Sequence, residues 1–176
     1  MTYPSYFNNL SQSLTSLSLD DCGLKGDFPT KVFSRPNLQI LILAEYLGGL
    51  TAHFPESNWN SPLEDLVIVG TSFTGPLPES IGNLKSLRTL DLRYCNFTRP
   101  LPTSLGNLTQ LTHLSAPDNQ LTGPIPSQAG ELPSLSYIFL QLNSLNGTIP
   151  SWLFTLPSLV RLDLSFNQLS GRVDEF

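Results

Sequence analysis

The feature that most constrains this chain is a leucine pattern that returns about every 24 residues. The motif L-x-x-L-x-L, with Ile or Ala allowed at its later positions, begins at seven leucines spaced 24 or 25 residues apart: Leu14, Leu38, Leu63, Leu87, Leu111, Leu135 and Leu159. A fixed period of this length is typical of repeat proteins, in which one structural unit stacks on the next. Because one unit cannot bury its own leucines, the core forms between neighbouring repeats.

The later repeats extend the motif to L-x-x-L-x-L-x-x-N-x-L-x-G-x-I-P. Alternating leucines predict a strand with one face buried. The asparagines (Asn119, Asn143, Asn167) can bind backbone groups where the chain leaves the strand, and the Gly-x-Ile-Pro segment predicts a bend after which regular pairing ends. We therefore expect an α/β repeat solenoid, a right-handed superhelix. Seven strands would form one parallel sheet on its concave face, with short 3₁₀ or helical segments and turns on the convex face.

Three segments carry a family resemblance. The sequences FTGPLPESIGNL (73–84), SLTSLSLDDCGLKGDFP (13–29) and LNGTIPSWLFTLPSLVRLDLSFNQLSG (145–171) resemble the plant-specific subclass of leucine-rich repeats, and the resemblance covers residues 13–173. The last two segments resemble ectodomains of plant receptor-like proteins of the disease-resistance kind. Polygalacturonase-inhibiting proteins share the same subclass. The resemblance implies an extracellular or plasma-membrane ectodomain.

The chain departs from that family at its ends. We expect residues 1–13 to be a short N-terminal flank, too short for a full cap, and residues 14–176 to form about seven repeats, the last one truncated. Neither a signal peptide nor a long apolar run is visible. Because end repeats need a polar outer face, we expect a fragment or truncated product that exposes the leucines of its first and last repeats.

The second repeat is irregular. Its segment 44–55 holds two residues more than the frame before the proline. Such an insertion forms either a protruding loop that helps to choose a ligand or a neutral extension on a surface turn.

The two cysteines, Cys22 and Cys95, occupy the asparagine position of their repeats. Three repeats separate them, roughly 14 Å at the usual strand spacing, which is too far for a disulfide bond. We therefore expect two buried structural thiols. No His, Cys and carboxylate cluster has the spacing of metal ligands, so neither a metal site nor a cofactor is expected.

Four N-x-S/T sequons mark candidate glycosylation sites, and we expect them to be exposed away from the concave face. They are Asn9, Asn96, Asn107 and Asn146.

Three polar residues of the predicted sheet are the candidates for a catalytic site: Asp91, His113 and Ser115. A nucleophile needs a hydrogen-bonded base, an orienting acid and an oxyanion hole. An open sheet face supplies no such hole, and side chains two residues apart on a strand stand about 7 Å apart. We therefore expect a solvated polar patch and no enzyme.

The concave face of the later repeats is the candidate binding site. Exposed aromatic side chains beside arginine are typical of binding hot spots. The candidate ligand-binding residues are Asp91, Arg93, Tyr94, His113, Tyr137, Phe139, Leu142, Arg161, Asp163 and Phe166.

Three functions remain open. The first is a recognition module that binds a peptide or protein and signals through partner kinases, including a coreceptor kinase. The second is an inhibitor of a secreted cell-wall hydrolase, whose basic surface would meet Asp65, Asp91 and Asp163. The third is a truncated fragment without independent function. A net charge of −5 argues against a nucleic-acid partner, and this segment itself is not expected to contact a membrane.

Overall fold

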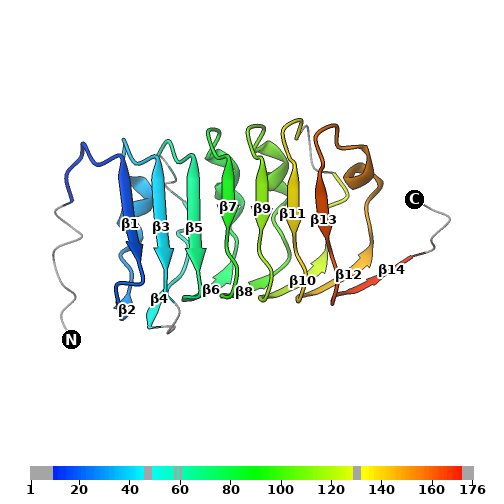
Figure 1. The fold of residues 1–176 in the computed structure, drawn as a ribbon, viewed down its shortest axis with the longest axis horizontal. Helices are drawn as coiled ribbons and strands as arrows, with labels where there is room; N and C mark the ends of the chain where they lie inside the picture. The colour runs from blue at the N-terminus through cyan, green and yellow to red at the C-terminus, as the bar shows by residue number, and fades with distance from the viewer. Residues whose placement is uncertain (1–9, 46–48, 58, 60, 129–131, 172–176) are drawn as a thin grey trace.

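One strand from each repeat builds the first sheet. The computed structural model describes residues 10–45, 49–57, 59, 61–128 and 132–171. Seven parallel strands lie side by side in sequence order, with the two chain ends at opposite ends of the row (Figure 1). They are β1 (Ser16–Asp20), β3 (Ile40–Ala44), β5 (Asp65–Val69), β7 (Thr89–Asp91), β9 (His113–Ser115), β11 (Tyr137–Phe139) and β13 (Arg161–Asp163). This confirms the predicted parallel sheet.

The strands pair in register with the leucine motif. The second apolar residue of each motif faces its equivalent on the next strand, in the series Leu17, Leu41, Leu66, Leu90, Leu114, Ile138 and Leu162. Leu41, Leu66 and Leu90 are fully buried. Because side chains alternate along a strand, the residues on either side of each leucine point away from the core, on the concave face of the sheet.

A second parallel sheet follows the turn after the first, and the sequence did not predict it. Its strands are β2 (Gly26–Asp27), β4 (Leu50–Ala52), β6 (Ser72–Pro76), β8 (Asn96–Arg99), β10 (Gln120–Pro124), β12 (Ser144–Thr148) and β14 (Gln168–Ser170). Strands β6, β10 and β12 end at or shortly before a proline, which confirms the expectation that regular pairing ends there. Pro76 and Pro124 themselves end strands, where the missing N–H costs no ladder hydrogen bond.

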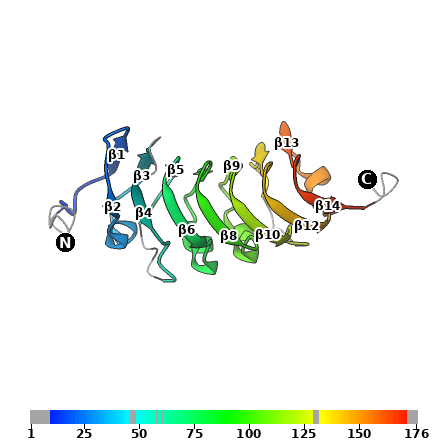
Figure 2. The same cartoon turned by 90° about the horizontal axis from the view of Figure 1, so that it is seen from below.

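Short 3₁₀ helices occupy the other side of the molecule. Figure 2 shows the first sheet on the inner side of a shallow arc and the helices on the outer side. They are η2 (Thr30–Ser34), η3 (Glu79–Asn83), η4 (Thr103–Asn107) and η5 (Ser151–Thr155). Helices η3 and η4 pack closely, since a Cβ atom at Gly82 would lie 2.6 Å from the Ser104 side chain. The expected convex layer of short helices and turns is therefore present.

Aromatic rings fill the core of the first four repeats. Phe54 lies at the centre of this aromatic cluster, with ring centroids 5.1 Å from both Trp59 and Phe97 and 6.0 Å from Phe73. Phe28 and Phe33 complete it, and all six residues are buried. Edge-to-face and offset stacking at these distances adds to the gain from burial.

Asparagine amides link the last four repeats. Asn143 Oδ1 accepts the Leu121 N–H of the preceding repeat at 3.0 Å, and its Nδ2 donates to Ala116 O and Leu140 O. Asn119 and Asn167 make equivalent bonds, so the three residues form an asparagine ladder. Each amide satisfies backbone groups that turn away from the strand, and this confirms the role predicted for the asparagines.

The two cysteines differ, and only one fits the prediction. Cys95 is buried and its Sγ donates to Ile68 O of the preceding repeat, so burial raises the pKa of its thiol. Cys22 is exposed, and the expectation of a second buried thiol was wrong. Among the described residues, the Cys22 Sγ bonds only to Asp20 O of its own repeat. Both thiols are free.

Other expectations meet the limits of the described residues. Part of the irregular second repeat, residues 46–48, lies outside them. Within the described part of the chain, no helix is long and apolar enough to cross a membrane. The leucines of the two end repeats, such as Leu17 and Leu162, are only partly buried, as expected.

Candidate ligand-binding face

Strand register brings the candidate residues into columns that cross the sheet. His113, Tyr137 and Arg161 face one another on β9, β11 and β13. Asp91, Ser115, Phe139 and Asp163 lie in the neighbouring column, on β7, β9, β11 and β13. Seven of the ten predicted ligand-binding residues therefore lie on, or directly after, four adjacent strands of the concave face: Asp91, Arg93, His113, Tyr137, Phe139, Arg161 and Asp163.

The rings on β9 and β11 form a stack at the centre of this face. The His113 and Tyr137 rings lie 4.6 Å apart and nearly parallel, at 14°. The Phe139 ring lies 6.4 Å from the Tyr137 ring at 23°. Tyr137 and Phe139 are half-buried and His113 is exposed, so the stack keeps one side open. We call these three residues the aromatic stack.

An ion pair borders the aromatic stack on β7. The Arg93 guanidinium donates to Asp91 through Nε at 2.9 Å and through Nη2 at 2.6 Å. The Asp91 side chain is 11% exposed and that of Arg93 is 49% exposed. The prediction of a solvated patch is therefore wrong for Asp91, because its carboxylate is largely covered and already neutralised. Two-point geometry of this kind makes the pair stronger than an ordinary surface ion pair.

The three candidate catalytic residues, Asp91, His113 and Ser115, do not form a catalytic triad. The described hydrogen bonds link His113 Nδ1 to the Thr112 hydroxyl and Asp91 to Arg93, and none joins His113 to Ser115 or to Asp91. The His113 ring is held by stacking on Tyr137 instead. Within the described residues, no group of three His, Cys, Asp or Glu side chains is placed to hold a metal ion.

Three large apolar side chains project from the turn that follows the strands. Tyr94, Leu142 and Phe166 are 57%, 44% and 76% exposed. Each has a positive φ between 54° and 57°, a conformation that costs a bulky residue about 1 kcal/mol or more. Gly70 and Asp118, which tolerate this conformation better, occupy the same repeat position elsewhere. These three residues combine backbone strain with exposed apolar surface at one edge of the aromatic stack, which is unusual for a surface that has no binding role.

Polar groups close the far end of the face on β13. Asp163 Oδ1 accepts bonds from the Ser165 hydroxyl at 2.6 Å and from its backbone N–H, which lowers the pKa of the carboxyl group. Arg161 is exposed beside it. Glu45, directly after β3, is buried, and its Oε1 accepts the Leu24 N–H at 3.0 Å.

The sequons lie away from the aromatic stack. Asn96 begins β8 and Asn146 lies in β12, both in the second sheet, and Asn107 ends η4 on the convex side. All three are exposed, and Asn9 lies outside the described residues. Glycans at these three positions would leave the concave face open.

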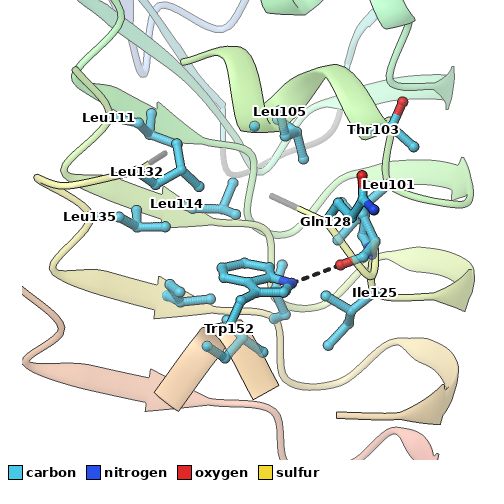
Figure 3. A pocket seen from close by; sticks show the side chains of 15 residues that line it. Leu101, Thr103, Leu105, Leu111, Leu114, Ile125, Gln128, Leu132, Leu135 and Trp152 are labelled. Atoms are coloured by element: carbon cyan, nitrogen blue, oxygen red, sulfur yellow. Dashed lines mark hydrogen bonds between the residues drawn. The ribbon is translucent and has the colours of Figure 1, made fainter. Parts of the chain in front are cut away.

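A cavity inside the core is not a ligand site. Its volume is about 30 Å³, close to that of one water molecule in the liquid, and its walls are mostly leucine and isoleucine. Figure 3 shows Trp152 at its edge, where the indole N–H donates to Pro126 O at 2.8 Å. The cavity is therefore a packing feature.

Sequence reasoning gave no role to an aliphatic patch near the other end of the sheet. Ile40 and Ile42 of β3 and Val67 of β5 lie half-buried on the concave face, with Ile42 in register with Val67. Their positions were read correctly from the leucine alternation, but aliphatic residues are so common in strands that they carried no signal. The signal is their contrast with Ser18 and Asp91 in the same column.

Comparisons with known proteins agree with this architecture. Family models described as "Leucine Rich Repeat" match residues 86–108 and 155–172. Receptor-like protein 6 of Arabidopsis thaliana is 43% identical over 81 residues, which cover 46% of this chain and 8% of that protein. Receptor-like protein 9DC1 of Solanum pimpinellifolium is 36% identical over 97 residues, which cover 54% of this chain and 11% of that protein. The chain has the leucine-rich-repeat fold and is similar to plant receptor-like proteins.

Solved ectodomains share the fold of this leucine-rich-repeat chain. The Arabidopsis receptor kinase HAESA, in complex with the peptide hormone IDA and the co-receptor SERK1, aligns with a TM-score of 0.84 and 34% identity over 91% of this chain and 27% of that one. The plant peptide hormone receptor RGFR1 in complex with RGF2 aligns with a TM-score of 0.84 and 31% identity, over 97% of this chain and 27% of that one. The fold is that of receptor ectodomains, a recognition fold and not an enzyme fold. The chain spans about a tenth of the length of the curated relatives cited above.

Proposed function

We propose that this leucine-rich-repeat chain is the ligand-recognition module of an extracellular plant receptor-like protein. It binds a peptide or protein on the concave face of repeats four to seven. The observation that carries the proposal is the aromatic stack, in which the His113 and Tyr137 rings lie 4.6 Å apart on an open sheet face. Ligand side chains that cover the rings gain apolar burial and stacking.

The surroundings of the stack suit recognition. Arg161 and Arg93 supply charged donors beside the rings, and aromatic residues with arginine are the side chains enriched in binding hot spots. Strands β7, β9 and β11 are fixed by parallel pairing on both sides, so little side-chain or backbone order remains to be gained there on binding. A preorganised face of this kind needs no closing loop.

The relatives favour a further partner. The structure of the receptor kinase HAESA contains both a peptide hormone and the co-receptor SERK1. By analogy we assign the signalling step to a partner kinase that contacts the ligand-bound module. The location outside the plasma membrane rests on the same relatives and on the exposed sequons Asn96, Asn107 and Asn146, which we propose as glycosylation sites.

The experiment selects peptides from a random dodecapeptide phage library on the immobilised chain and measures binding of the enriched peptides by fluorescence anisotropy. The double variant Tyr137→Ala, Phe139→Ala should weaken binding by about 100-fold, the loss expected for two hot-spot residues. The matched control Phe154→Ala removes an exposed ring from η5 and should leave binding within about twofold of wild type. Failure to enrich any peptide, or equal binding by the double variant, would refute the proposal.

A further inference from the structure

The aliphatic patch of Ile40, Ile42 and Val67 is bounded on the concave face. On one side, the same columns carry Ser16 and Ser18 of β1. On the other side, they carry Thr89 and Asp91 of β7. The patch therefore ends on both sides at polar residues, and it is separated from the aromatic stack by β7. Bounded apolar groups on an otherwise polar face are what a side-chain subsite requires.

One carboxylate lies beside this patch without a neutralising partner. Asp65 of β5 is half-buried, in register with Ile40 on one side and Thr89 on the other. Neighbouring acids are paired: Glu64 lies 3.7 Å from Arg88, and Asp91 holds Arg93. Among the described residues no cation pairs with Asp65. The patch thus offers apolar contact together with one free negative charge.

We infer that β3 and β5 form a second anchor subsite for the same ligand, which takes an aliphatic side chain next to a lysine or arginine. The inference rests on the proposed function, because the first anchor is the aromatic stack. Charge complementarity commits the occupant to a basic linear peptide, since the chain carries a net charge of −5 and Asp65 needs a cation. A buried or half-buried carboxylate gains more from such a partner than a fully solvated one.

The strand spacing sets the distance between the two anchors. Strand β11 lies three strands from β5 and four strands from β3 in the sheet order. At about 4.8 Å per strand the separation is roughly 14 to 19 Å, and an extended peptide rises about 3.3 Å per residue. The ligand should therefore carry its aliphatic and basic pair about four to six residues from the residue that covers the aromatic stack.

The test uses the random dodecapeptide library on the whole 176-residue chain. Enriched peptides should share an aliphatic residue next to Lys or Arg, about four to six positions from an aromatic or large apolar residue. Ile42→Thr keeps the β-branch and Asp65→Asn keeps the shape, and each should weaken binding by about fivefold. Ser18→Ala, in the same column as Ile42 but outside the patch, is the matched control and should bind as wild type does.

The outcomes separate this inference from the proposed function. Peptides that lose binding in the Tyr137→Ala, Phe139→Ala variant but bind Ile42→Thr and Asp65→Asn as tightly as wild type would overturn the second subsite and leave the first intact. Enriched peptides without the basic residue would overturn the role of Asp65. A library that enriches nothing, or peptides indifferent to the double variant, would refute the proposed function and this inference with it. Circular dichroism of each variant confirms that the fold is unchanged.

Discussion

In the first four repeats, rings from successive turns of the solenoid pack against one another, whereas an amide from each of the last three repeats binds the backbone of the repeat before it. The strands differ in parallel. β1, β3 and β5 have five residues each, and β7, β9, β11 and β13 have three. The four later strands stop early, and the residue before the asparagine position takes a positive φ in both halves of the molecule, as at Gly70, Tyr94 and Leu142.

This difference bears on where the candidate ligand-binding face can form. The tight turns of the later repeats project Leu142 and Phe166 outward, next to the strands that carry the aromatic stack. The comparison predicts that the two halves lose stability by different physical mechanisms, cavity formation in one and unsatisfied backbone groups in the other.

The largest expected effect is in the aromatic cluster. Phe73→Ala removes a fully buried ring that packs on Phe28 and Phe54, and it should lower the free energy of unfolding by about 4 kcal/mol. Chemical denaturation followed by circular dichroism measures the change. A loss below about 1 kcal/mol would mean that the cluster is not a unit of stability.

The asparagine ladder should follow. Asn143→Ala leaves the Leu121 N–H without its acceptor and removes one of the two donors to the Ala116 carbonyl, which keeps a bond from Asn119 Nδ2 at 3.3 Å, and we expect a loss of about 2 kcal/mol. The matched control is Gln120→Ala, an exposed amide that bonds only to the exposed Asn96 side chain at 3.4 Å. Equal losses for the two variants in denaturant titrations would contradict the special role of the ladder.

A glycine pair tests the second sheet in both halves. Gly123 and Gly26 share a repeat position and a positive φ. A Cβ atom at Gly123 would lie 2.8 Å from the Pro100 side chain, whereas a Cβ atom at Gly26 would have no other atom within 4 Å. Alanine should cost about 1 kcal/mol at Gly26, from backbone strain alone, and about 2 kcal/mol or more at Gly123. Thermal unfolding of both variants gives the comparison, and a Gly26 variant as unstable as the Gly123 variant would be evidence against it.

The smallest change would extend the ladder into the earlier repeats. Cys95 occupies the asparagine position and already donates to Ile68 O, the acceptor equivalent to Leu92 O for Asn119. Cys95→Asn supplies a second donor and an acceptor, so we expect a gain of about 1 kcal/mol in the free energy of unfolding. The same denaturant titration measures it, and a marked loss would show that the neighbouring Thr71 requires the thiol.

The sequence predicted the parallel sheet and its columns because the leucine period determines both register and side-chain direction. It missed the second sheet because Gly-x-Ile-Pro is a breaker in isolation, and only the stacking of equivalent segments turns it into a strand. It placed Asp91 in solvent because pairing with Arg93 depends on side-chain conformation. The aliphatic patch around Ile42 escaped notice because strand residues of that type are ordinary on their own.

The most direct test of the account maps where a ligand touches the chain. Nuclear magnetic resonance of the ¹⁵N-labelled 176-residue chain, titrated with an enriched dodecapeptide, reports the affected amides. We predict that the shifts concentrate on β9, β11 and the strands beside them, including His113, Tyr137 and Phe139. Shifts confined to the second sheet or to η3, η4 and η5 would contradict the assignment of the concave face as the binding surface.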